Sequence, residues 1–202
     1  MNKIRFALVG CGRISKKHAE IFGENQIKDA KLTAVCDINE ERARFYGEKY
    51  QVPSFSDMHE MMGKVGDQID VINVLTESGN HATHVIELAS YGKHIVVEKP
   101  MALTLDDADA MIRACDAARI KLFVVKQNRY NYPVQKLRQA MEEKRFGKLV
   151  LGTVRVRWCR KQAYYDQDAW RGTWSMDGGV FTNQASHHVD LLEWMMGEPE
   201  SV

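Results

Sequence analysis

Apolar runs alternate with amphipathic stretches over the first part of the chain, and this alternation predicts the fold class. Short, continuously apolar segments are typical of strands covered on both faces. We expect strands at residues 3–10, 31–37, 70–76, 93–100 and 121–127. We expect helices between them, at residues 11–25, 39–50, 57–63, 80–92 and 104–120. Strands that each lead into a helix favour right-handed crossovers, so the pattern predicts an α/β domain with a doubly wound parallel sheet.

The hydrophobic pattern changes after Gln127. A helix is predicted to begin near Pro133, because proline is well tolerated in a first helical turn. Residues 149–160 then alternate apolar and polar positions, which is typical of an antiparallel strand with one covered face. We therefore expect residues 1–127 to form the first domain. Residues 128–202 should belong to an α+β domain with an open antiparallel sheet.

Composition and charge restrict the function classes. The net charge of +1 provides no field that would attract nucleic acid or an anionic membrane. No apolar run approaches the roughly 18–20 residues of a membrane span, and Phe6–Val9 is shorter than the roughly 7–15 apolar residues of a signal peptide. The four cysteines are scattered without a C-x-x-C pair, which favours free thiols in the cytoplasm.

The segment VGCGRIS follows the first predicted strand and opens the first predicted helix. Gly10 permits a tight turn, and Gly12 lets the backbone approach a pyrophosphate at the helix N-terminus. Ser15 stands at the third glycine position of this fingerprint. Asp37 ends the second strand, where a carboxylate accepts hydrogen bonds from ribose hydroxyls and repels a 2′-phosphate. The pattern predicts a Rossmann domain that prefers NAD to NADP, the alternative being a glycine turn with a helix-capping aspartate.

Glu98, Lys99 and Pro100 end the predicted strand at residues 93–100. The carboxyl edge of an open parallel sheet is where ligands bind. Pro100 restricts Lys99 to extended backbone geometry. Lys99 is therefore a candidate functional residue, the alternative being a surface ion pair with Glu98, which is geometrically poor because adjacent strand residues point to opposite faces.

Two adjacent histidines, His187 and His188, precede an apolar helical stretch. Adjacent helical residues diverge by about 100°, so the two rings do not readily share one metal ion. Asn183 and Asp190, the helical neighbours of His187, make a poor zinc set, and we expect no metal. An imidazole titrates near working pH and suits proton transfer, so a histidine of this pair is a candidate base. The alternative is a structural ring on a helix, which we expect for His188.

The G-x-G-x-x-S turn, Asp37, the loop TESGNH, the EKP triplet and the GG…H…D segment together resemble the Gfo/Idh/MocA oxidoreductases, which are NAD(P)-dependent sugar and cyclitol dehydrogenases. The resemblance covers residues 3–202. In that family the EKP lysine lies beside the nicotinamide and the substrate hydroxyl, which here implies Lys99. The implied cofactor contacts are Gly10, Gly12, Arg13, Ile14, Asp37, Thr76, His81, Glu98, Lys99 and Gln127.

The segments KQNRYNYPVQKLR and AWRGTWSMDGGVFTNQASHH are similar to one subgroup of that family, the UDP-N-acetyl-2-amino-2-deoxyglucuronate 3-dehydrogenases. These enzymes oxidise the 3-hydroxyl of a nucleotide-linked amino sugar acid for bacterial polysaccharide biosynthesis, and some recycle NAD with 2-oxoglutarate. The resemblance implies this substrate class and a homo-oligomer. Two alternatives stay open: a dehydrogenase of a free sugar or inositol, and a non-catalytic NAD-binding regulatory protein.

The family motif D-x-x-x-H-x-x-D has Asn183 at its first position, then His187 and Asp190. An amide cannot act as a second carboxylate, so proton transfer is expected to fall on His187 as the base, with Lys99 steering the substrate hydroxyl; the reverse assignment stays open. A diphosphate and a carboxylate call for guanidinium groups. The expected substrate contacts are Lys99, Arg129, Tyr130, Asn131, Arg157, Trp170, Arg171, Asn183 and His187, with Arg160 as a further candidate.

Members of this family are considerably longer than this chain, and their second domain contains a large open sheet. We therefore expect a truncated chain with an intact NAD domain and an incomplete second domain. Apolar faces and unpaired strand edges should be exposed in that domain, around Val154, Val156 and Trp158. NAD binding should be retained, whereas sugar oxidation should be weak or lost.

Overall fold

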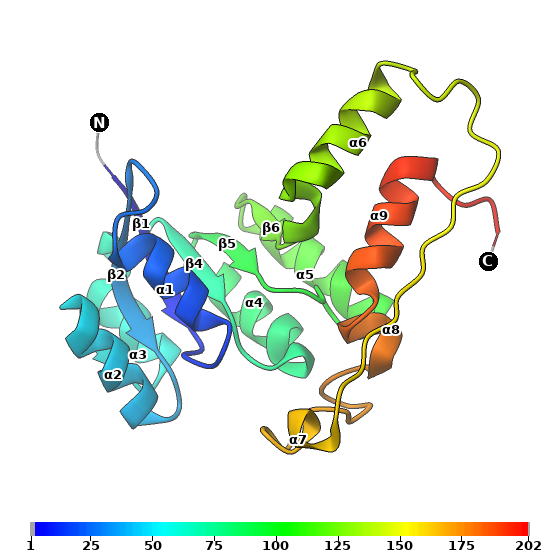
Figure 1. Cartoon of the computed structure of the whole chain (residues 1–202). Helices are drawn as coiled ribbons and strands as arrows, with labels where there is room; N and C mark the ends of the chain where they lie inside the picture. The colour runs from blue at the N-terminus through cyan, green and yellow to red at the C-terminus, as the bar shows by residue number, and fades with distance from the viewer. Residues whose placement is uncertain (1–2, 202) are drawn as a thin grey trace. The chain divides into compact units, whose positions relative to one another are not determined.

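A computed structural model describes residues 3–201, and the chain divides between Val124 and Val125 into two compact units. The first unit contains a six-stranded parallel sheet of order β3-β2-β1-β4-β5-β6 (Figure 1). Its strands are β1 (Ile4–Val9), β2 (Ala30–Cys36), β3 (Ser54–Phe55), β4 (Val71–Val74), β5 (His94–Val97) and β6 (Leu122–Val124). This is the Rossmann order, and the five strands expected from the hydrophobic pattern are confirmed. The two-residue β3 is too short to leave a pattern in the sequence.

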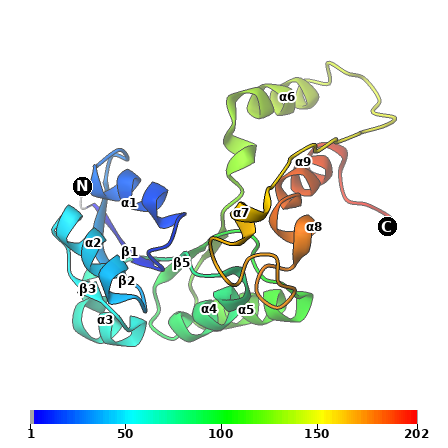
Figure 2. The ribbon, with the colours of Figure 1, turned by 60° about the horizontal axis from the view of Figure 1, so that its bottom comes forward.

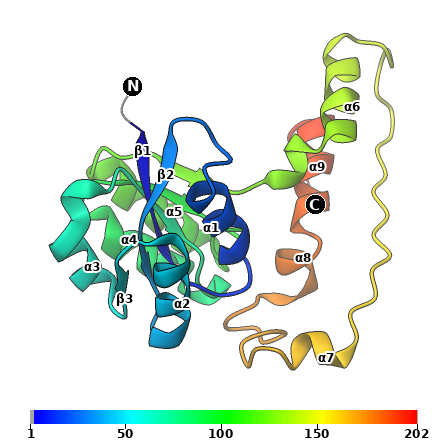
Figure 3. The same cartoon turned by 60° about the vertical axis from the view of Figure 1, so that its left-hand side comes forward.

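Helices cover both faces of this sheet. They are α1 (Ser15–Gly23), α2 (Glu40–Tyr50), α3 (Met58–Val65), α4 (His81–Ala89) and α5 (Leu105–Ala117). Leu8 of β1 packs in a cluster with Phe22 of α1 and Tyr46 of α2. Its neighbours Ala7 and Val9 belong to the cluster formed with α3, α4 and α5 on the opposite face (Figure 3). Successive side chains of a strand are thus buried on opposite faces of the sheet, which explains why the strands are continuously apolar in sequence.

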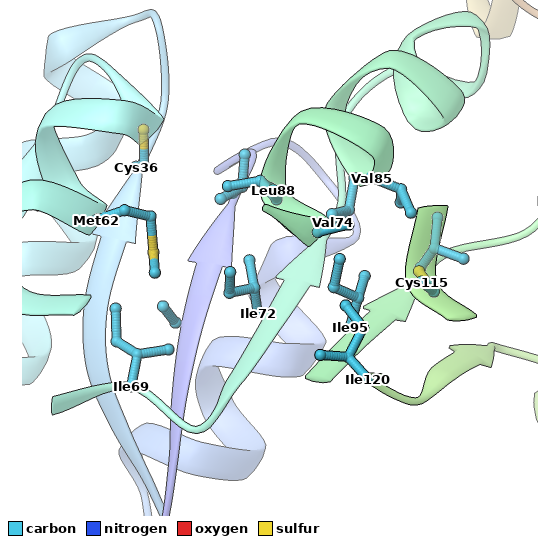
Figure 4. Close-up of a cluster of buried hydrophobic side chains, with 14 of the residues drawn as sticks. Cys36, Met62, Ile69, Ile72, Val74, Val85, Leu88, Ile95, Cys115 and Ile120 are labelled. Atoms are coloured by element: carbon cyan, nitrogen blue, oxygen red, sulfur yellow. The ribbon is translucent and has the colours of Figure 1, made fainter. Parts of the chain in front are cut away.

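The larger cluster joins β4, β5 and α4, which lies beside α5 (Figures 2 and 4). Ile72 and Ile95 point from the strands toward Val85 and Leu88 of α4, and all four are fully buried. Each side chain of this size contributes about 1.5–3 kcal/mol on burial. Helical spacing would also place Ile86 near the buried face, beside Val85 and Ala89. Ile86 is instead 38% exposed, because the buried face of α4 includes Ala82 and Leu88.

The second unit is helical in its described part. It contains a short 3₁₀ helix, η3 (Gln127–Tyr130), followed by α6 (Tyr132–Glu142), α7 (Gln162–Tyr165), α8 (Gly179–Asn183) and α9 (Ser186–Met196). Pro133 lies in the first turn of α6, as expected. Helices α6 and α9 lie side by side, and the Arg138 guanidinium donates a hydrogen bond to the carbonyl of Trp194 (Figures 1 and 3). Among residues 3–201, no helix is long and apolar enough to cross a membrane.

The antiparallel strand expected at residues 149–160 is not formed in this structure, and the open sheet is not confirmed among residues 3–201. These residues are extended, but no described residue pairs with them as a neighbouring strand. A strand needs a neighbour that takes up its backbone hydrogen bonds, and an alternating pattern supplies only the covered face. Trp158 is 53% exposed, and Val154 and Val156 are also exposed, so the apolar side of this segment has little cover.

Candidate cofactor and catalytic site

Four strand ends of the first unit lie in register at one edge of the sheet. Val9 pairs with Cys36 of β2 and with Val74 of β4, and Val74 pairs with Val97 of β5. The residues that follow these strand ends are Gly10, Asp37, Leu75 and Glu98. The edge includes the point between β1 and β4 where the strand order reverses, which is the usual ligand-binding position of such sheets.

The two glycines of the turn after β1 have different surroundings. Gly10 has a positive φ of 98°, and a Cβ there would lie 2.8 Å from the backbone carbonyl of Leu75. A Cβ on Gly12 would meet no heavy atom within 4 Å, so this backbone is open to a ligand. The buried Ser15 hydroxyl donates to the Gly12 carbonyl, which explains how serine fits the third position. No side chain caps the N-terminus of α1, and its first N–H groups can face an anion.

Asp37 is buried and braced by the backbone. Its Oδ2 accepts a hydrogen bond from the Cys11 N–H at 2.6 Å, and its Oδ1 accepts one from the Asn39 N–H at 2.8 Å. A carboxylate has about four lone-pair positions, so each oxygen retains acceptor capacity for a ribose hydroxyl. Arg13 and Ile14, the other predicted cofactor contacts of this turn, are exposed.

Glu98 lies in a buried network that the sequence analysis missed. The His18 Nε2–H donates to its Oε1 at 2.9 Å, and the Lys99 backbone N–H donates to its Oε2 at 3.1 Å. The Asn73 amide donates to His18 Nδ1 at 2.9 Å. One feature of the sequence could have indicated this network: His18 lies one helical turn after Ser15 of the glycine fingerprint, on the predicted first helix.

His81 is 1% exposed and lies between two backbone carbonyls. Its Nδ1 is 2.7 Å from the carbonyl of Pro100, and its Nε2 is 3.1 Å from that of Thr76. Burial lowers the pKa of His81, although both carbonyls act in the opposite direction. The neutral ring has one N–H, which donates across the shorter contact. The ring thus joins the segments that follow β4 and β5, and the cofactor contact expected for His81 stays a prediction. The Thr76 hydroxyl contacts His84 Nδ1 at 2.9 Å.

The predicted base lies on α9 in the second unit. His187 is buried, and the Gln127 amide donates to its Nε2 across 3.2 Å, which places the proton of the neutral ring on Nδ1. Asp190, one turn further, is also buried. It accepts two hydrogen bonds from the Arg129 guanidinium, at 2.8 and 2.7 Å, and lies 3.6 Å from Lys126 Nζ.

Two arginines predicted to bind substrate are engaged within the chain. Asp190 occupies the fork of Arg129 and raises its pKa, and the guanidinium also lies over the Trp194 ring. Arg171 donates to Asp168 at 2.8 Å and lies 4.5 Å from the centre of the Trp170 ring. Both guanidinium groups therefore have partners within the second unit, and their role as substrate contacts stays a prediction.

The remaining predicted substrate contacts divide between exposed and buried positions. Tyr130, Asn131 and Arg157 are exposed. Arg160 donates to the Gln184 side chain at 3.2 Å and lies over the Trp158 ring.

Asn183 is buried, and its amide donates to the carboxylate of Asp177. Asp177 also accepts a hydrogen bond from the Gly172 N–H at 2.8 Å. A buried carboxylate, that of Asp177, therefore lies beside the amide at position 183, and the sequence analysis missed it. No group of three or more potential metal ligands occurs among the described residues.

The glycine turn, the uncapped α1 and the buried Asp37 at the switch point together define a dinucleotide-binding oxidoreductase domain. Residues 4–126 match the family profile described as "Oxidoreductase family, NAD-binding Rossmann fold", and residues 134–202 match the "GFO/IDH/MocA C-terminal domain". The chain therefore belongs to the Gfo/Idh/MocA oxidoreductase family, and its cofactor is NAD. The resemblance found in the sequence is confirmed.

Solved structures of WlbA dehydrogenases are similar to this chain. The enzyme of Chromobacterium violaceum is 45% identical with a TM-score of 0.92, covering 98% of this chain and 56% of its own. That of Bordetella pertussis is 45% identical with a TM-score of 0.91, covering 97% and 60%. Both were crystallised with NADH and UDP-GlcNAcA. The myo-inositol 2-dehydrogenase of Thermotoga maritima is 32% identical over 96% of this chain and 55% of its own. The chain thus spans between half and two thirds of the length of these relatives.

Proposed function

We propose that this chain carries the NAD site and part of the substrate site of a dehydrogenase that oxidises the 3-hydroxyl of a nucleotide-linked amino sugar acid. The observation that carries the proposal is the 45% identity to two WlbA dehydrogenases crystallised with UDP-GlcNAcA, compared with 32% to an inositol dehydrogenase. The similarity includes the helical second unit, since it extends over 97–98% of the chain.

The residues at the sheet edge fit NAD, which accepts a hydride from a carbinol carbon when bound. The open backbone at Gly12 and the uncapped start of α1 suit a pyrophosphate. Asp37 suits the adenosine ribose diol, and its negative charge disfavours the 2′-phosphate of NADP. Lys99, at the end of β5, would then lie on the edge that carries the reacting end of the cofactor.

Proton transfer in this proposal falls on His187 and Lys99. His187 carries its proton on Nδ1, so the Nε2 lone pair is the acceptor and would exchange the Gln127 amide for the substrate hydroxyl. Lys99 would donate a hydrogen bond to that hydroxyl and polarise the developing ketone. A positive nicotinamide nearby would depress the pKa of this lysine, which keeps the reverse assignment as the alternative.

A dehydrogenase of a free cyclitol is the second candidate, and the similarity to a myo-inositol 2-dehydrogenase favours it. Re-oxidation by 2-oxoglutarate, a homo-oligomer, a cytoplasmic location and a role in polysaccharide biosynthesis are part of the first proposal. We also propose that residue 127 is the boundary between the NAD-binding domain and the second domain.

Calorimetric titration of the NAD-loaded chain tests the proposal. UDP-GlcNAcA is expected to bind more tightly than UDP-GlcNAc, which lacks the carboxylate, and more tightly than myo-inositol. NADH formation by the same samples then reports turnover. Binding of myo-inositol in preference to both nucleotide sugars would support the second candidate and contradict the first.

A further inference from the structure

We propose that His18 is a positioning residue for Lys99, acting through Glu98. His18 holds one carboxylate oxygen of Glu98 at 2.9 Å, and the other oxygen accepts the Lys99 backbone N–H at 3.1 Å. Helix α1, which begins at the cofactor turn, thereby sets the backbone position of the lysine at the end of β5. The proposal depends on the proposed function in one respect, namely that Lys99 takes part in the reaction.

The direction of the His18 hydrogen bond follows from Asn73. The Asn73 amide, in a side chain that is 1% exposed, donates to Nδ1 of His18. The proton of the neutral ring therefore lies on Nε2, facing Glu98. The carboxylate of Glu98 is buried and therefore needs hydrogen-bond donors. A hydrogen bond to an ionised acceptor is stronger than a hydrogen bond between two neutral groups. Loss of the His18 donor should therefore displace Glu98 and release the Lys99 N–H.

The network begins at the cofactor turn itself. The hydroxyl of Ser15, the first residue of α1, donates a hydrogen bond to the carbonyl of Gly12. His18 lies one turn further along the same helix. On the other side of Lys99, the Pro100 carbonyl is held by His81. The peptide group before the lysine and the carbonyl of the residue after it are thus hydrogen-bonded to other side chains of the fold. Ordering of the turn by a dinucleotide should consequently reach Lys99 through His18 and Glu98.

Two substitutions separate this role from simple packing. His18→Gln places an amide nitrogen near the position of Nε2 and retains the donor to Glu98. His18→Asn places its amide near the position of Nδ1, retains the contact with Asn73 and loses the donor to Glu98. The two variants are similar in polarity, so each serves as the control for the other.

The experiment is residue-resolved amide hydrogen exchange by NMR, with and without NAD, together with calorimetric NAD binding. His18→Asn is expected to speed exchange of the Lys99 N–H by about tenfold or more, as the loss of one charge-assisted hydrogen bond implies, and His18→Gln should restore most of the protection. NAD should slow this exchange in the wild type and in His18→Gln, but much less in His18→Asn, at saturating NAD.

Equal exchange at Lys99 in the two variants would overturn the proposal. So would faster exchange throughout β4 and β5, for example at Ile72 and Ile95, because that result would show general loosening of the core. These measurements need no sugar substrate. A chain that binds no nucleotide sugar would therefore contradict the proposed function and leave the exchange result as the test of His18.

Discussion

Asp37 accepts a hydrogen bond from the backbone N–H of Cys11 at 2.6 Å, so the carboxylate expected to bind the cofactor ribose also braces the glycine turn. Replacement of Asp37 by alanine should therefore have two effects. NAD affinity should fall and discrimination against NADP should relax, because the acceptor and the repulsive charge are both lost. The free energy of unfolding should also fall, by about 1–3 kcal/mol, because the buried N–H loses its partner.

Calorimetry with both dinucleotides and urea unfolding measure the two effects separately. Asp37→Asn is the matched variant, since it keeps an acceptor oxygen for Cys11 and loses the charge. It should retain more stability than Asp37→Ala while still admitting NADP. Wild-type protein that binds NADP as tightly as NAD would show that the assigned role of Asp37 is wrong.

The two turn glycines should respond differently to alanine. Gly10→Ala introduces a Cβ 2.8 Å from the Leu75 backbone at a positive φ, so the free energy of unfolding should fall by about 1–3 kcal/mol. Gly12→Ala meets no protein atom and should leave stability nearly unchanged while weakening NAD binding, because the methyl group would occupy the approach of the pyrophosphate. Denaturation and calorimetry of both variants check this pair, and unimpaired NAD binding by Gly12→Ala would contradict the placement of the pyrophosphate.

In the complete enzyme, Lys99→Ala and His187→Ala should each lower turnover of UDP-GlcNAcA by roughly 10²–10⁴-fold, the usual contribution of acid–base assistance. NAD binding should change little in His187→Ala. The control is His188→Ala, which should be milder because the His188 ring packs against Trp158, with ring centres 5.2 Å apart. Initial rates of NADH formation measure these effects. Equal losses at both histidines, accompanied by inhibition by chelators, would instead favour a metal site.

Stability of the first unit should depend on pH through His81 and His84. Burial lowers the pKa of both side chains in the folded state from the ordinary value of 6.5. As pH falls through about 6.5, the unfolded chain binds protons that the folded chain does not, so the free energy of unfolding should decrease. The decrease should level off below the folded pKa values. Glu98, Glu77 and Glu87 favour the protonated rings and moderate the effect, whereas the charges of His84 on His81 and of His59 on His84 act in the opposite direction.

Urea unfolding between pH 8 and pH 5 measures this dependence. His81→Asn keeps a donor near the Pro100 carbonyl and removes the titrating group, so its unfolding free energy should vary less over the same range. An unchanged pH dependence in this variant would exclude His81 as a contributor.

Thiol reactivity should distinguish the cysteines. Burial is the main cause that raises the pKa of the Cys11 and Cys36 thiols to about 12. Cys115 is also buried, whereas Cys159 is exposed. At pH 8 the native protein should therefore react rapidly with a thiol reagent at Cys159 alone among the four cysteines, and at all four in denaturant. Peptide mapping after brief alkylation checks the site. Rapid labelling of Cys11 in the native protein would contradict the buried position of its side chain.

Local sequence determined much of the first unit. Continuous apolar runs mark strands that are buried on both faces, and a glycine turn between such a run and a helix marks the dinucleotide site, so β1, β4, Gly10 and Asp37 were predictable. The signals of these features lie within a few neighbouring residues. The same reasoning failed for residues 149–160, because an alternating pattern describes one face of a strand and cannot supply the neighbouring strand.

Only the tertiary structure decided which side chains act together. His18 and Glu98 are 80 residues apart in the chain, and Arg129 and Asp190 are 61 apart. Their contacts depend on sheet register and on the rotation of each helix about its axis, and neither quantity is contained in a local window of sequence. For that reason the charge of Arg129 was visible in the sequence, whereas its engagement by Asp190 was not. The same reason explains why the sequence marked Lys99 as a candidate but left its support by His18 to the folded chain.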